Sequence, residues 1–302
     1  MSFNDASRNR TIDVDIYYPA TTSGSGTPVE SGQFPVLVFG HGFLMGTGVY
    51  DVVWNELVPE GYIMVLPQTE SGLTPSHEDF GKDIAFLVDQ MQLEGQNGSS
   101  PFNGAVAATS AAMGHSMGGG SAFLSVQYST NINAIATLAA AETNPSAEAA
   151  AANISIPSLI ISGANDCVTP PADHQQLMHN ALISNCKSYV SITGGSHCQF
   201  ASFSLPCSTG ELTCSADISD VQQQELTASL LLPWLNFYLK SDCAAGDDFQ
   251  NLLSTGTGIT SQQNCSLSCL NVNEKEERTI QLYPNPAKDM VTISGIGADD
   301  TV

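Results

Sequence analysis

Apolar and polar positions follow two different patterns over the first 240 residues: alternation and short continuous apolar runs. Between Thr11 and Tyr18 apolar and polar residues alternate, which predicts a half-buried strand near a sheet edge. Further along, apolar residues form short continuous runs, as in strands buried on both faces. These runs cover residues 35–39, 62–66, 106–113, 132–139, 156–161 and 188–192.

Stretches with helical spacing lie between and after these runs. Apolar residues recur at three- and four-residue steps from Phe80 to Met91, and residues 177–183 and 226–239 behave similarly. Buried strands that alternate with amphipathic helices predict an α/β fold, with a mostly parallel central sheet and helices on both faces. Ligands bind such sheets beyond the carboxyl ends of the strands.

The pattern stops near residue 243. Residues 244–278 are rich in polar and small residues, with a mixed charge run at 274–278, and we interpret them as a linker. A short strand-like segment follows within residues 279–302, which are too few to bury a core. The predicted domains are therefore a catalytic domain at 1–243, the linker, and the start of a small β domain at 279–302.

Composition narrows the classes of partner. The chain of 302 residues carries 8 Lys+Arg and 30 Asp+Glu, a formal net charge of −22, so nucleic acid is not an expected partner. No apolar run approaches the length of a membrane-spanning helix. All eight cysteines lie in the second half without a CxxC pair, which favours disulfides over a zinc site.

The strongest chemical signal is Gly114-His115-Ser116-Met117-Gly118. A buried-type strand precedes it and a small-residue helix follows, which is the setting of a nucleophile elbow. In such an elbow Ser116 is strained and its hydroxyl is presented, while glycines allow the close packing. A structural glycine-rich turn is the alternative interpretation.

A serine nucleophile needs a base and an acid. His197 follows a predicted strand and Gly194-Gly195-Ser196, so it is the expected base, whereas His174 and His179 fall in a predicted helix. Asp166 lies in the exit loop of the preceding strand and is the expected acid, with Glu142 as its rival.

An oxyanion hole needs two backbone N–H groups aimed at the developing charge. One should come from Met117, directly after the serine. The other should come from the loop after Phe39, and we expect Phe43 to supply it because Gly42 lets the backbone turn there.

Residues 9–240 resemble proteins of the α/β-hydrolase fold, and among these the cutinase-like polyester hydrolases and the chlorophyllase-like esterases. The matching motifs are Phe39-Gly40-His41-Gly42-Phe43, the elbow sequence, Ile161-Ser162-Gly163-Ala164-Asn165-Asp166 and Gly194-Gly195-Ser196-His197. The resemblance implies a Ser116, His197 and Asp166 triad that hydrolyses esters through an acyl-enzyme, without a cofactor.

The same resemblance guides the expectations for substrate contacts. Polyester hydrolases usually carry a tryptophan after the strand that follows the nucleophile helix, but residues 138–143 contain no aromatic residue. Phe200 and Phe203 could replace it, or could pack within a surface loop. The expected substrate-binding residues are Phe43, His115, Met117, Phe200 and Phe203.

Spacing and cysteines add two further expectations. About sixteen residues separate the strands that end near Ala139 and begin near Ile156, which leaves no room for a cap domain and favours bulky or polymeric esters. Similar polyester hydrolases sometimes join the acid and base loops by a disulfide, which here is Cys167–Cys198. The remaining expected pairs are Cys186–Cys243, Cys207–Cys214 and Cys265–Cys269.

The tail resembles the opening of the type A carboxyl-terminal sorting domain of the type IX secretion system. The matching residues are Leu282-Tyr283-Pro284-Asn285-Pro286-Ala287 and Val291-Thr292-Ile293-Ser294. This resemblance implies a secreted or cell-surface protein whose tail meets the secretion machinery. Residues 1–10 contain no signal peptide, and we expect one to have been removed.

The function expected from the sequence is therefore a secreted, monomeric serine carboxylic ester hydrolase acting on bulky or polymeric esters, including PET-type polyesters. A chlorophyllase-like or short-chain lipid esterase is the main alternative. A serine peptidase of similar fold and a non-catalytic surface-binding protein are the alternatives from other classes.

Overall fold

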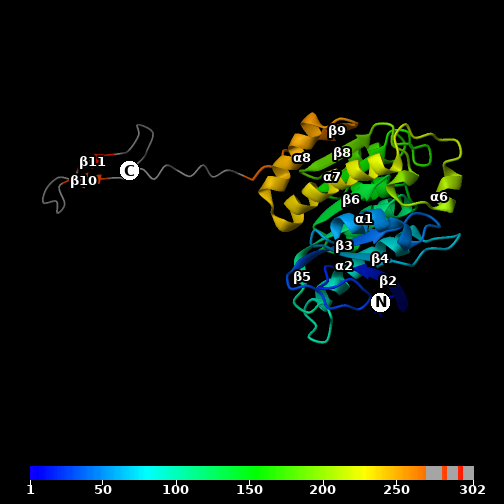
Figure 1. Ribbon diagram of the computed structural model, residues 1–302, viewed down its shortest axis with the longest axis horizontal. Coiled ribbons are helices and arrows are strands. Elements are labelled where there is room, and N and C mark those ends of the chain that lie inside the picture. The colour runs from blue at the N-terminus through cyan, green and yellow to red at the C-terminus, as the bar shows by residue number, and fades with distance from the viewer. Residues whose placement is uncertain (270–280, 284–291, 295–302) are drawn as a thin grey trace. The chain divides into compact units, whose positions relative to one another are not determined.

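The computed structural model describes residues 1–269, 281–283 and 292–294 (Figure 1). The chain divides into two units, Met1–Leu267 and Ser268–Val302, which are described separately below. Among the described residues, none of the helices has the length and apolar character needed to cross a bilayer.

The first unit is built on a nine-stranded sheet with the order β1-β2-β4-β3-β5-β6-β7-β8-β9. Neighbours from β4 through β8 run parallel, and the outer strands β1, β2 and β9 pair antiparallel. The strands are β1 (Ser2–Asp5), β2 (Arg10–Tyr17), β3 (Phe34–Gly40), β4 (Ile63–Pro67), β5 (Val106–His115), β6 (Ala134–Leu138), β7 (Ser158–Gly163), β8 (Lys187–Ile192) and β9 (Ile259–Gln263).

Helices cover both faces of this sheet (Figure 1). They are α1 (Asp51–Leu57), α2 (His77–Glu94), α3 (Met117–Ser125), α4 (Ala147–Ala151), α5 (Gln175–Ala181), α6 (Leu205–Gly210), α7 (Asp220–Lys240) and α8 (Cys243–Thr255). Three short 3-10 turns accompany them among the described residues: η1 (Thr47–Tyr50), η2 (Val126–Tyr128) and η3 (Cys198–Phe200).

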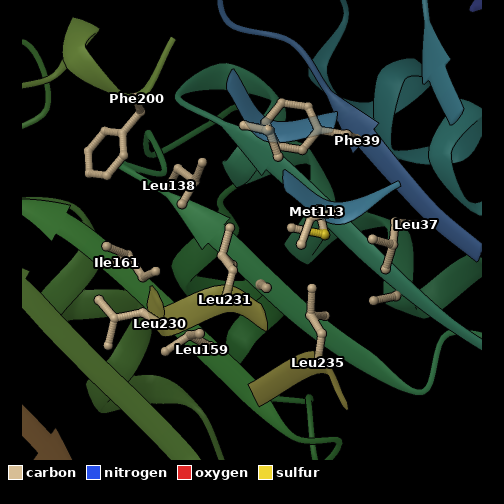
Figure 2. Packing of buried hydrophobic residues seen from close by; sticks show 14 of the residues in the cluster. Leu37, Phe39, Met113, Leu138, Leu159, Ile161, Phe200, Leu230, Leu231 and Leu235 are labelled. Atoms are coloured by element: carbon tan, nitrogen blue, oxygen red, sulfur yellow. The ribbon is translucent and has the colours of Figure 1, made fainter. Parts of the chain in front are cut away.

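Continuous apolar strands fill two separate cores because successive side chains point to opposite faces. In β3, Leu37 and Phe39 join the core under α1, α7 and α8, whereas Val36 and Val38 join the core under α2 to α5. Figure 2 shows the first of these cores, where Leu230, Leu231 and Leu235 of α7 lie against side chains from the central strands.

These observations confirm the predicted α/β-hydrolase architecture. Each apolar run of the sequence corresponds to a strand, and α2, α5 and α7 appear at the three stretches with helical spacing. Between β6 and β7 the chain forms only the five-residue helix α4, so no cap domain covers the carboxyl edge there.

The first unit extends further than the predicted boundary at residue 243. The stretch from 244 to 267, which composition predicts as linker, forms α8 and then β9, which pairs with β8 at the sheet edge. Phe249 of α8 is fully buried, and it is flanked by polar residues that hide the helical period. The linker interpretation is therefore wrong for this stretch.

In the second unit, β10 (Gln281–Tyr283) and β11 (Thr292–Ser294) form an antiparallel pair. The remaining residues of the predicted linker and sorting domain, 270–280, 284–291 and 295–302, lie outside the described residues. The sorting domain stays a prediction.

Candidate active site

Ser116 occupies the turn between β5 and α3, as predicted. Its backbone has φ 54° and ψ −119°, a conformation that L-residues avoid and that persists only where the surroundings enforce it. The surroundings do so here: Ser116 N donates to Leu138 O, and Ser116 O accepts from Ala141 N. A Cβ on Gly114 would collide with the backbone of Gly118, so the strand and helix can approach only without side chains.

Asp166 and His197 come together in the folded chain. Asp166 follows β7 and His197 follows β8, two neighbouring parallel strands whose carboxyl ends meet at one edge. His197 Nδ1 lies 2.7 Å from Asp166 Oδ2, and both side chains are buried. The rival acid Glu142 instead accepts a hydrogen bond from Glu148 N.

The carboxylate of Asp166 is oriented by its own loop. Its Oδ1 accepts hydrogen bonds from Val168 N and Thr169 N, each 2.8 Å long. Its Oδ2 accepts a further bond of 2.8 Å from the Thr169 hydroxyl. Four donors, with His197 included, satisfy a buried charge that would otherwise be costly.

Thr169 and Gln175 complete this arrangement, although sequence reasoning missed them. Thr169 Oγ1 lies 3.1 Å from His197 Nδ1 and receives a hydrogen bond from Gln175 Nε2. Gln175 is fully buried and also donates to Ala140 O. A single polar residue in a loop or at a helix start carries no periodic signal, so only the fold reveals these two.

The geometry directs the free nitrogen of His197 away from Asp166. Because Nδ1 faces Asp166 and Thr169, Nε2 lies on the opposite side of the ring. The imidazole of His115, the residue before Ser116, is 4.7 Å from that of His197 between ring centroids. Within the described part of the chain, Ser116 Oγ makes no hydrogen bond. The hydrogen bond between a nucleophile and its base is often long or poorly aligned before substrate binds, so this absence does not exclude His197 as the base of Ser116.

The loop after β3 lies beside the elbow. A Cβ on Gly118 would overlap the backbone of Gly40, so the end of β3 packs directly on the start of α3. Gly42 N already donates to the hydroxyl of Tyr50 at 2.7 Å, which leaves Phe43 N as the next backbone donor of the loop. Met117 is the first residue of α3, where an N–H has no intrahelical acceptor. These positions fit the predicted oxyanion donors.

His115 has a different place from the one predicted. It is fully buried, so it cannot contact a substrate, and the prediction that it does so is wrong. Its Nδ1 lies 3.1 Å from the Tyr50 hydroxyl, and its Nε2 lies 3.1 Å from the carbonyl oxygen of His197. Burial, together with the neighbouring His197, lowers the pKa of His115 well below 6.5, so the ring is neutral.

A chain of hydrogen bonds therefore runs from Gly42 N–H to the Tyr50 hydroxyl, on to His115, and from His115 Nε2–H to His197 O. This chain is called the Tyr50–His115 relay below. It connects the loop that carries the expected oxyanion donor with the loop that carries the expected base.

The two phenylalanines after His197 behave in opposite ways. Phe200 is 1% exposed, and Figure 2 shows its ring within the buried cluster that contains Leu138 and Leu231. Its predicted role in substrate binding is therefore wrong, because η3 turns the side chain inward. Phe203 is 79% exposed and Phe43 is 45% exposed, so both remain available for substrate, whereas the Met117 side chain is almost wholly buried.

The disulfides differ from every predicted pair. Cys167 pairs with Cys214, Cys198 with Cys207, and Cys186 with Cys265. Cys243 and Cys269 are also disulfide-bonded, so all eight cysteines, which lie within residues 1–269, are oxidised. The predictions fail for two reasons. A segment after His197 lies between the acid and base loops, and β9 brings Cys265 beside Cys186.

Of the two remaining histidines after Ser116, His174 is half-buried and His179 is buried. His174 Nδ1 accepts a hydrogen bond from Glu142 N, which requires an unprotonated nitrogen, and burial lowers the pKa of His174. His179 is buried in α5, and burial together with Lys187 lowers its pKa to about 4. Neither ring contacts His197 or Asp166 through a hydrogen bond.

Part of the chain is similar in sequence to curated plant proteins. The chain is 33% identical over 104 residues to chlorophyllase-1, chloroplastic, of Citrus unshiu, covering 34% of this chain and 32% of the relative. It is 32% identical over 117 residues to chlorophyllase-2 of Arabidopsis thaliana, covering 37% of this chain and 36% of the relative. The chain thus spans about a third of the length of the curated relatives it matches.

A family model described as PET hydrolase-like matches residues 12–209. This range is well over half of the chain, and it contains Ser116, Asp166 and His197. The chain belongs to the PET hydrolase-like family.

Proposed function

We propose that this protein is a serine carboxylic ester hydrolase that uses Ser116 as nucleophile, His197 as base and Asp166 as the acid that orients the base. The observation that carries the proposal is the buried contact of 2.7 Å between His197 Nδ1 and Asp166 Oδ2. This contact lies at the same sheet edge as the strained turn at Ser116. The family and the chlorophyllase relatives support an ester substrate.

The reaction proceeds in two halves. Ser116 Oγ attacks the ester carbonyl while His197 Nε2 takes its proton, and Asp166 stabilises the imidazolium that forms. The amides of Phe43 and Met117 stabilise the oxyanion. The tetrahedral intermediate expels the alcohol, which receives the proton from His197. Water, deprotonated by His197, then attacks the acyl-enzyme, and Ser116 recovers a proton as the acid leaves.

The test of this assignment is turnover of a soluble nitrophenyl ester by Ser116→Ala. We expect a loss of about 10⁴-fold or more in kcat, since an alanine cannot form the acyl-enzyme. Ser121→Ala is the matched control, because Ser121 lies in α3 and its buried hydroxyl has no hydrogen-bond partner among the described residues. Wild-type turnover in Ser116→Ala contradicts the proposal.

The substrate class we propose is a bulky or polymeric ester such as a PET-type polyester. It is supported by the family description, by the uncapped sheet edge, and by the exposed aromatic rings of Phe43 and Phe203. Phe203→Ser should lower hydrolysis of polyester film and leave that of a soluble ester unchanged. Leu93→Ser is the control, because Leu93 is also exposed but lies at the end of α2. Equal loss on both substrates contradicts a polymer-contacting role.

A pigment ester is the second candidate substrate, because the curated relatives carry the name chlorophyllase. Mass spectrometry of products from polyester film, cutin, short-chain esters and chlorophyll distinguishes the two. A larger kcat/KM on chlorophyll than on any polyester favours the second candidate.

We also propose that the protein acts outside the cell. The oxidised state of all eight cysteines within residues 1–269 is compatible with an extracellular location. Export through the tail at 279–302 is tested by fractionating cells that express the chain with and without these residues. Equal export of both forms contradicts a role of the tail.

A further inference from the structure

A segment that follows the base loop bridges the acid loop and the base loop. We call residues 205–217 the bridging segment. Its Cys207 is bonded to Cys198, next to His197, and its Cys214 is bonded to Cys167, next to Asp166. Asn165 Nδ2 also donates to Ser215 O. The bridging segment is therefore tied to both loops of the proposed catalytic pair.

Glu211 lies between these two cysteines and its carboxylate faces the base loop. Its Oε1 accepts a hydrogen bond of 2.5 Å from His197 N and one of 2.9 Å from Cys198 N. These N–H groups stand at the start of η3, where the backbone offers them no acceptor. Hydrogen bonds to an ionised acceptor are shorter and stronger than neutral ones.

The backbone of His197 is thus held on both sides of its side chain. Glu211 holds its N–H, and the imidazole of His115 holds its carbonyl oxygen at 3.1 Å. The preceding residue Ser196 is fixed by the amide of Gln223, which accepts from Ser196 N and donates to Ser196 O, each at 2.8 Å. These contacts leave the His197 ring as the part that is free to act.

Two disulfides, one of them through the buried Cys207, help to keep Glu211 in place. Its neighbour Leu212 is 81% exposed and Leu205 is 65% exposed, so apolar burial does not anchor the bridging segment at these positions. The disulfides at Cys207 and Cys214 lie four residues before and three residues after Glu211. They restrict the positions that the carboxylate can take.

We propose that Glu211 is a positioning residue for the base: it fixes the backbone of His197 so that the imidazole keeps its alignment with Asp166 and Ser116. This inference rests on the proposed ester hydrolysis. Glu211 itself touches neither substrate nor the reacting atoms, and its effect passes through two backbone N–H groups.

The test compares Glu211→Ala and Glu211→Gln in the full chain with a soluble nitrophenyl ester. Alanine removes the acceptor, so kcat per folded protein should fall about 10- to 100-fold while KM stays within about twofold. Glutamine keeps a side-chain oxygen for both N–H groups, so it should restore kcat to within about threefold of wild type. Glu225→Ala, which removes an exposed carboxylate of α7, should leave kcat unchanged.

A second readout is independent of ester chemistry. Hydrogen exchange at the amides of His197 and Cys198 should accelerate in Glu211→Ala and stay slow in Glu211→Gln. If wild type does not hydrolyse any ester while the exchange result holds, the proposed function fails and the fixing of the His197 backbone by Glu211 stands.

Two results overturn the positioning role itself. One is a wild-type kcat in Glu211→Ala when wild-type protein is active and Ser116→Ala is not. The other is an equal loss of kcat in the alanine and glutamine variants, since the amide keeps the hydrogen bonds and removes only the charge.

Discussion

The two loops that flank Ser116 are secured by different means. The base loop is held from the surface by the bridging segment, through the Cys198–Cys207 disulfide and the carboxylate of Glu211, and the Cys167–Cys214 disulfide ties the same segment to the acid loop. The loop after β3 is held from the interior by the Tyr50–His115 relay, and no cysteine lies in it. The bridging segment, whose Leu205 and Leu212 are exposed, depends on covalent bonds to keep its geometry, whereas the buried groups of the relay can rely on hydrogen bonds that water does not compete for.

Among the changes near the base, Asp166→Asn should have the largest effect, because it removes the carboxylate that contacts His197. An amide can still contact His197, but it favours the wrong imidazole tautomer and cannot stabilise the imidazolium. We expect kcat on a soluble ester to fall about 10⁴-fold. Thermal unfolding should show a folded protein, and Asp173→Asn serves as a carboxylate control because Asp173 makes no hydrogen bond or ion pair with His197. Activity within tenfold of wild type contradicts the assignment of Asp166.

Removal of Cys167–Cys214 detaches the bridging segment from the acid loop. This bridge spans 47 residues, for which chain entropy predicts a loss of about 4 kcal/mol in the free energy of unfolding. Cys167→Ser/Cys214→Ser should therefore lower Tm. It should also lower kcat when kcat is measured at a temperature well below the Tm of the variant. The control Cys186→Ser/Cys265→Ser removes a bridge near the β8–β9 pair and should lower Tm only. Equal kcat in both double variants would mean that the bridging segment does not matter for chemistry.

Tyr50→Phe removes the hydroxyl at the centre of the Tyr50–His115 relay. It leaves Gly42 N–H and His115 Nδ1 without their partner, and each buried unpaired group costs about 1–3 kcal/mol. We expect a lower Tm, measured by thermal unfolding, and a kcat lowered about tenfold, because the Phe43 amide loses its fixed position. Tyr62→Phe removes a hydroxyl that bonds Asn236 on α7, and it should affect Tm alone. An unchanged Tm in Tyr50→Phe contradicts the relay.

Mild acid should lower the free energy of unfolding through two buried histidines, His115 of the relay and His179 of α5. Burial lowers the pKa of His115, and that of His179 to about 4, while an unfolded chain titrates near 6.5. The unfolded chain therefore binds protons first as pH falls, so stability is complete above pH 6.5 and declines below it. Tm measured from pH 7 to 5 should fall, with a shallower slope in His179→Gln. A Tm that rises in this range contradicts neutral buried rings.

The strands, and the positions of Ser116, Asp166 and His197 at their ends, could be predicted from the sequence. Strands that are buried on both faces appear in it as continuous apolar runs. The residues that end such strands meet at one edge. The disulfides could not be predicted, since the path of the bridging segment depends on contacts such as that of Glu211. Phe200 lies in a short turn without a period, so its inward orientation has no sequence signal. Helix α8 could not be predicted because polar residues flank its buried Phe249 and hide the helical spacing of apolar residues.

The most direct test of the catalytic assignment is labelling with a fluorophosphonate, followed by mass spectrometry of the peptides. A serine activated by its base reacts with this probe, and an ordinary serine does not. The account predicts one adduct per chain, on Ser116, with labelling lost in His197→Ala. An adduct at another residue, or equal labelling of Ser116 in His197→Ala, would contradict it.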